Sequence, residues 1–251
     1  MTAPTEKIKD DPDWRDWLAF VGPLASYLFL ASVVIAIWER VEIQLIASQS
    51  PTVTLSIAIF RLICITALLG FGFALILQRF PIRISPSSIA VGLMGAAIWI
   101  LLCRMNLESK LFSTLGFAPD LLGKRESINP WALFETENSL NLFLFVRFSL
   151  LIMAVPIAEE LFLRGFLLPY FKDSNWSHLP LEKLDRSSVG ITIAYGVMTH
   201  PSEWIAASIW FAMITIMMLR TRRFWDCVVA HSVTNTILGI YIILAQDWRL
   251  W

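Results

Sequence analysis

Two adjacent glutamates, Glu159 and Glu160, stand inside an apolar segment of the sequence, and Arg164 follows four residues after the second. On a helix, that spacing puts Glu160 and Arg164 on one face, while Glu159 points about 100° away. One carboxylate can then pair with the guanidinium, and the other is available as a general base that activates water. The simpler alternative is a salt bridge that closes a helix end.

Two further polar positions lie in apolar surroundings. His200 ends an apolar run just before Pro201, a position that also suits a structural helix cap. His231 and Asn235 are four residues apart in a later apolar run and share a helix face. Their imidazole and amide groups could stabilise an oxyanion, or they could hydrogen-bond to a neighbouring helix. Polar groups in a membrane span are costly, so each is a functional candidate.

The composition indicates that a membrane surrounds these residues. The chain has 57% hydrophobic and 16% charged residues, 11 tryptophans and a mean hydropathy of +0.65. Soluble domains have about 45–50% apolar and roughly 25% charged residues. The 20 basic and 20 acidic residues cancel, so no nucleic acid partner is expected. The expected surroundings are the lipid bilayer.

A helix needs about 20 apolar residues to span the bilayer core. About seven segments qualify or come close, and the polar stretch 104–141 leaves room for an eighth. We therefore predict an all-α polytopic membrane protein with about seven to eight transmembrane helices around an intramembrane polar cavity. We expect a single domain at 17–251, a solvated tail at 1–16 and a motif-bearing core at about 142–245. The predicted spans are 17–38, 53–77, 88–103, 142–158, 189–200, 204–219 and 225–245.

Basic residues between the spans predict an orientation, because short basic segments tend to stay in the cytoplasm. Alternating spans from a cytoplasmic N-terminus put three basic clusters on one side, in what we expect to be the bacterial inner (plasma) membrane. The polar residues would then line a cavity open to the cytoplasmic half. The clusters are Lys7, Lys9 and Arg15; Arg79 and Arg83; and Arg220, Arg222 and Arg223.

The order Glu159-Glu160-x-x-x-Arg164, then His200, then His231-x-x-x-Asn235 resembles the three motifs of the CAAX-processing and bacteriocin-processing (CPBP) family of intramembrane proteases. One position differs. That family usually has an aromatic residue four positions before the second-motif histidine, where this chain has a glycine, with a tyrosine one residue earlier. The C-terminal part also resembles a bacterial subgroup associated with exosortase-type sorting systems.

The resemblance implies an intramembrane endopeptidase that hydrolyses a peptide bond of a membrane-associated protein or peptide. Glu159, helped by His200, would activate water, and His231 with Asn235 would stabilise the oxyanion. Glu160 and Arg164 would hold the site in shape. A glutamate-activated water without a bound metal is consistent with these residues, and no cofactor is certain. A zinc ion held by Glu159, His200 and His231 stays open, although no HExxH helix supports it.

Three other interpretations remain open. Cys227, His231 and Asn235 lie on one helix face and offer papain-like residue types, but a stack on one helix surrounds a carbonyl poorly. A transporter could use the glutamate and histidines as a proton path, although paired inverted halves are missing from the sequence. A non-catalytic membrane immunity or scaffold protein would retain the protease fold without its chemistry.

Overall fold

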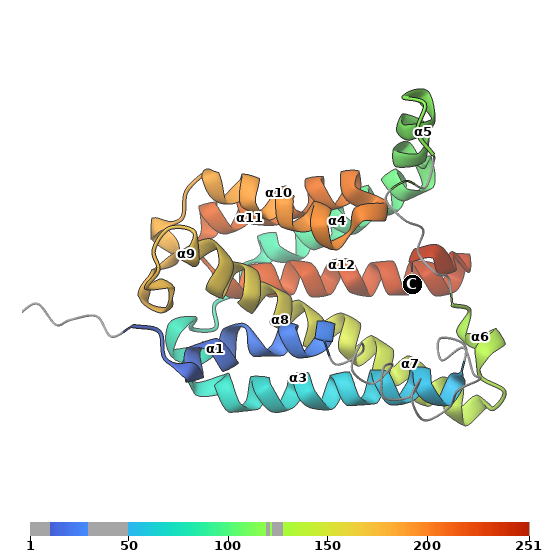
Figure 1. Cartoon of the computed structure of the whole chain (residues 1–251), viewed down its shortest axis with the longest axis horizontal. Coiled ribbons are helices and arrows are strands. Elements are labelled where there is room, and N and C mark those ends of the chain that lie inside the picture. The colour runs from blue at the N-terminus through green and yellow to red at the C-terminus, as the bar shows by residue number, and fades with distance from the viewer. Residues whose placement is uncertain (1–10, 30–49, 119–120, 122–127, 251) are drawn as a thin grey trace, which may run out of the picture.

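The computed structural model describes residues 11–29, 50–118, 121 and 128–250. Within these residues the fold is helical throughout and contains no strand, which confirms the predicted all-α class. The long helices run roughly parallel, with the chain reversing direction from one to the next (Figure 1). The helices are α1 (Trp14–Phe20), α3 (Pro51–Arg79), α4 (Pro86–Met105), α5 (Leu107–Thr114), α6 (Pro130–Leu133), α7 (Glu137–Ser149), α8 (Val155–Glu160), α9 (Leu168–Tyr170), α10 (Ser187–Thr199), α11 (Trp204–Thr221) and α12 (Phe224–Ala245).

Five helices of the described chain are long and apolar enough to cross a membrane. They are α3, α4, the helix from Glu137 to Tyr170, α11 with the short 3-10 helix Pro201–Glu203 before it, and α12, while α10 is a shorter apolar helix. The protein is therefore an integral membrane protein. The second part of the first predicted span, 30–38, lies outside the described residues, as do residues 1–10 of the predicted tail. The described part of this region holds α1, which already begins at Trp14, and a helical stretch at 22–29.

The helix that carries the two glutamates runs without a break from Glu137 to Tyr170. It contains two π-helical segments, Leu150–Ala154 and Leu161–Leu167. Each precedes a proline, Pro156 or Pro169, which has no N–H to donate to the carbonyl four residues earlier, and a widened turn keeps the helix continuous. The prediction that this span ends at 158 is wrong, because the glutamates lie within the helix and not at its end.

Packing around α11 and α4 sets the relative positions of the helices. Over an apolar stretch of 18 residues in each span, half of the residues are buried in the span that contains α11, against 17% in α3. α11 is therefore central, and α3 lies at the lipid-facing edge of the bundle. α4 approaches α11 and α12 closely at two glycines. A Cβ at Gly92 would lie 2.7 Å from the Ala230 carbonyl oxygen, and one at Gly95 would lie 2.8 Å from Trp210 Cδ1. Small residues at such crossings let helix backbones approach in membranes.

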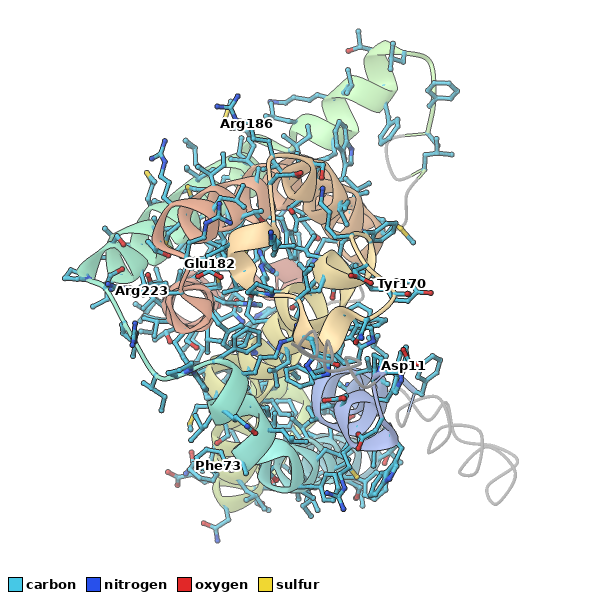
Figure 2. The ribbon with its side chains drawn as sticks, turned by 90° about the vertical axis from the view of Figure 1, so that its left-hand side faces the viewer. Asp11, Phe73, Tyr170, Glu182, Arg186 and Arg223 are labelled. Atoms are coloured by element: carbon cyan, nitrogen blue, oxygen red, sulfur yellow. The ribbon has the colours of Figure 1, made fainter. Side chains whose placement is uncertain are left out.

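Polar contacts fix the end of the bundle at which α3 ends and α12 begins, the end that faces the viewer in Figure 2. The buried carboxylate of Asp226 accepts hydrogen bonds from the main-chain N–H and the hydroxyl of Ser85, each 2.7 Å long. Trp225 Nε1 donates to the Phe80 carbonyl oxygen at 2.7 Å. These bonds tie the start of α12 to the linker between α3 and α4.

Candidate active site

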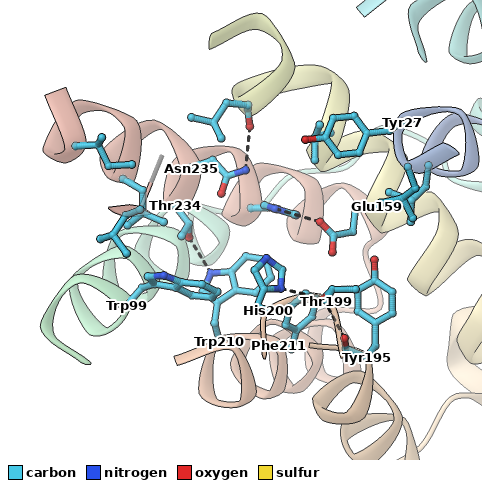
Figure 3. Close-up of a pocket in the computed structure, with 18 of the residues that line it drawn as sticks. Tyr27, Trp99, Glu159, Tyr195, Thr199, His200, Trp210, Phe211, Thr234 and Asn235 are labelled. Carbon is cyan, nitrogen blue, oxygen red and sulfur yellow. Dashed lines mark hydrogen bonds and ion pairs between the residues drawn. The ribbon is translucent and has the colours of Figure 1, made fainter. Parts of the chain in front are cut away.

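A cavity of about 320 Å³ lies among α10, α11, α12 and the helix Glu137–Tyr170, hereafter the motif helix (Figure 3). Glu159 from α8, His200 at the end of α10, and His231 and Asn235 from α12 all line it. Four polar side chains that are up to 76 residues apart in sequence therefore line the same cavity. Glu160 and Arg164 do not line this cavity, because they are buried behind it at 0% exposure.

From Glu159 the cavity extends toward the end of the bundle at which α10 and α12 terminate. Thr199, Ile242 and Leu250 line that part of it. The arginines that follow α3 and α11 lie at the opposite end, since those helices run the other way. The prediction that the cavity opens toward the basic half of the protein is therefore wrong, and depth counted along single helices misjudged it because the motif helix continues past the glutamates.

His231 joins the two glutamates. Its Nδ1 lies 3.0 Å from Glu160 Oε1, and its Nε2 lies 3.8 Å from Glu159 Oε2. Glu160 is paired in turn with Arg164, whose Nη1 is 2.9 Å from Glu160 Oε2. That ion pair is close but poorly aligned for a hydrogen bond, so its attraction is mainly electrostatic. Since an ionised carboxylate only accepts, Glu160 holds the proton of His231 on Nδ1, and Nε2 faces the cavity side.

The orientation of His200 depends on its neighbour Thr199. The Thr199 hydroxyl donates to the Tyr195 carbonyl oxygen at 2.9 Å and lies 2.9 Å from His200 Nδ1. Because that hydroxyl has a single proton, it can accept a hydrogen bond from Nδ1–H of the imidazole. The ring also packs edge-on against Trp99, with centroids 5.4 Å apart. These two contacts hold the plane of the imidazole.

Asn235 is anchored to the motif helix. Its Nδ2 donates to the Leu151 carbonyl oxygen at 2.9 Å, inside the first π-helical segment. A π-helical turn shifts the i→i−4 pattern, so carbonyl groups there can accept from other helices. The amide retains a second N–H and its carbonyl oxygen for the cavity. The bond also holds α12 and the motif helix at a fixed separation beside Glu159.

Two further cavity residues, Tyr195 and Phe211, were not among the predicted site residues. The Tyr195 hydroxyl lies within hydrogen-bonding reach of the Glu159 carboxylate, although this tyrosine is not at the usual aromatic position of the second motif. Gly196 occupies that position, and a Cβ there would lie 2.4 Å from Phe211 Cδ2. The Phe211 ring from α11 therefore fills the space beside Gly196. This replacement of the usual aromatic side chain by the Phe211 ring is seen only in the packing of α10 on α11.

The zinc set that the sequence left open is not assembled. Among the described residues, no three His, Cys, Asp or Glu side chains converge closely enough to hold a metal ion.

The papain-like alternative also loses its nucleophile. Cys227 is completely buried, does not line the cavity and directs its Sγ toward the Arg223 carbonyl oxygen at 3.9 Å. A substrate carbonyl in the cavity cannot reach it. Cys227 and His231 are four residues apart on α12 and share a helix face, but the α12 residues that line the cavity begin at His231.

The comparison with protein families bears directly on this site. The family model described as Type II CAAX prenyl endopeptidase Rce1-like matches residues 141–237. The predicted family resemblance is confirmed. The CAAX-protease-like segment contains every motif residue discussed above and ends two residues after Asn235. No curated protein and no solved structure matches the chain.

Proposed function

We propose that this protein is an intramembrane endopeptidase that hydrolyses a peptide bond of a membrane-associated protein or peptide. The observation that carries the proposal is the convergence of Glu159, His200, His231 and Asn235 on one cavity within a CAAX-protease-like segment. The active site of a soluble enzyme is reached by water directly and needs no polar cavity between apolar helices. A membrane-buried site needs a wet, polar space of this kind, since water must reach the peptide bond.

The reaction begins with a water molecule between Glu159 and the substrate carbonyl. The Glu159 carboxylate takes one proton from the water, and His200 in the wall of the same cavity assists it. The water oxygen bonds to the carbonyl carbon, and the carbonyl oxygen becomes an oxyanion. Hydrogen-bond donors that already face this oxygen stabilise its negative charge without having to reorient.

The oxyanion donors are the second N–H of Asn235 and, when its ring is protonated, Nε2–H of His231. Collapse of the tetrahedral intermediate breaks the C–N bond, and Glu159 returns its proton to the leaving amine. The products are a new carboxyl end and a new amino end, and the glutamate is again a carboxylate. Glu160 and Arg164 do not touch substrate; they position His231.

The test compares wild-type protein with Glu159→Gln, which keeps the side-chain size but removes the base. Glu137→Gln is the matched control, because Glu137 is exposed in the first turn of the same membrane helix. Purified proteins in liposomes are given an internally quenched peptide with a prenylated CAAX end, and cell membranes are compared by mass spectrometry of protein termini. Loss of cleavage in Glu159→Gln alone supports the proposal. Identical termini in all three strains, with no peptide cleavage, would refute it.

The cellular setting is part of the same proposal. Basic residues gather where α3 and α11 end, which favours a cytoplasmic location for that end and for the N-terminus, in a bacterial inner membrane. The cavity then extends toward the other side of the membrane. The narrower resemblance to an exosortase-associated subgroup stays a prediction.

A further inference from the structure

A second cavity, of about 540 Å³, lies at the end of the bundle opposite to the candidate active site. It is enclosed by α1, the linker between α3 and α4, the loop 177–182, and the turn between α11 and α12. Figure 2 looks onto this end, where the labelled Arg223 and Glu182 lie on neighbouring segments. Parts of the chain about 200 residues apart thus meet around one space.

The charges around this cavity are unbalanced. Four arginines line it against two carboxylates, and His178 adds a further charge when protonated. Among the ion pairs between described residues, none joins these arginines to a carboxylate within salt-bridge distance, although Asp16 lies near Arg79. The arginines are Arg79, Arg83, Arg222 and Arg223, and the carboxylates are Asp16 and Glu182.

Two of the arginines are held in place by uncharged partners. Arg79 Nη2 donates to the Trp176 carbonyl oxygen at 2.8 Å, and Arg222 Nη1 donates to the Leu181 and Leu184 carbonyl oxygens at 2.6 and 2.8 Å. Main-chain carbonyl groups fix a guanidinium without cancelling its charge. Arg83 and Arg223 are exposed at the cavity edge. The result is a rigid inner pair and an adaptable outer pair of cations.

The cavity sits where the apolar spans end. Leu75, Phe80 and Phe224 form part of its wall, so its inner side is apolar. In the adjoining linker, Ile82 is 60% exposed and Ile84 is 52% exposed, which places hydrophobic side chains on the outer surface beside the arginines. A ligand here would meet cations and hydrocarbon together, as lipids do at the bilayer boundary.

We propose that this cavity binds the phosphate-bearing headgroup of an anionic phospholipid, with the acyl chains lying along the neighbouring apolar surface. The phosphate of the lipid lies among the four arginines, because bidentate guanidinium–phosphate contacts are strong and geometrically matched. The shared chemistry is that of a phosphate ester, which a soluble molecule also offers. The apolar wall and the exposed isoleucines favour the lipid as its source.

The proposal is independent of peptidase activity, so it is tested by binding. Full-length protein is released from detergent for native mass spectrometry with phosphatidylglycerol, phosphatidylcholine or soluble glycerol 3-phosphate at increasing concentration. One double variant, Arg83→Gln with Arg223→Gln, removes the exposed cations of the cavity. The matched control, Arg186→Gln with Arg220→Gln, removes two exposed arginines from the same end of the bundle that do not line the cavity.

Each arginine near a membrane surface contributes roughly a fivefold factor in the affinity for an anionic lipid. We therefore expect the cavity variant to bind phosphatidylglycerol about 25-fold more weakly than wild type, and the control variant to stay within about twofold. Wild type should prefer phosphatidylglycerol over phosphatidylcholine and should not retain glycerol 3-phosphate.

Three results would overturn the proposal. Equal losses in the two double variants would mean that the lipid is attracted by the general charge of this end. Equal binding of the two lipids would show that headgroup charge is irrelevant. Binding of glycerol 3-phosphate as tightly as phosphatidylglycerol would identify a soluble phosphate ester as the ligand. Thermal unfolding of each variant within a few degrees of wild type ensures that lost binding does not reflect lost folding.

Discussion

The buried ion pair of Glu160 and Arg164, behind the candidate active site, allows a quantitative prediction. Glu160 and Arg164 are both at 0% exposure, 2.9 Å apart, and the same glutamate holds His231. Arg164→Met removes the cation and keeps a side chain of similar length. Glu160→Gln removes the anion and keeps the shape. We expect each single variant to be strongly destabilised and the double variant to recover much of that loss.

The magnitude follows from the geometry. Two unit charges 2.9 Å apart attract each other by roughly 6 kcal/mol at an effective dielectric constant of about 20. Part of that attraction offsets the loss of hydration, so removing one partner of a buried pair costs about 3–5 kcal/mol. Two independent losses would add to about 6–10 kcal/mol. Since the second substitution removes the charge that the first left unpaired, the double variant should lose about 3–5 kcal/mol or less.

The free energy of unfolding is measured by titrating each purified variant from mild detergent into sodium dodecyl sulfate and following tryptophan fluorescence. Cleavage of the quenched peptide is measured in parallel. The double variant should regain stability but not activity, because His231 no longer has a carboxylate on Nδ1. A coupling energy below about 1 kcal/mol would refute the reasoning, since the two residues would then act independently. Recovered activity in the double variant would show that His231 needs no such partner.

Three further substitutions test the cavity. Tyr195→Phe keeps the ring but removes the hydroxyl next to Glu159, and we expect about a 10- to 100-fold lower kcat, an altered pH profile and unchanged unfolding. Gly196→Ala places a Cβ 2.4 Å from a carbon of the Phe211 ring, and it should lower the free energy of unfolding by about 1–3 kcal/mol; full stability would show that the ring has room to move. Cys227→Ser should retain full cleavage activity, and a complete loss of cleavage without unfolding would restore the cysteine as a nucleophile.

Hydropathy and short spacings were sufficient for the membrane fold and for contacts within one helix. The apolar runs predicted α3, α4, α11 and α12 to within a few residues, because about 20 apolar residues in a helix have only one favourable place in a bilayer. The spacing of four predicted the pair of Glu160 with Arg164 and the common face of His231 with Asn235, since four residues make about one helical turn. These are properties of a helix in isolation.

Contacts between helices were decided by tertiary structure. Nothing in the spacing indicates that His231 takes Glu160 and not Glu159 as the partner of Nδ1, or that Asn235 binds the Leu151 carbonyl oxygen. The span of the glutamates was predicted to end at 158, but π-helical turns before the two prolines keep the helix continuous and place the glutamates within it. Tyr195 entered the cavity because α10 packs on α11. The physical reason is that sequence spacing sets direction around one helix axis, whereas the depth and rotation of one helix against another depend on side chains packed from both.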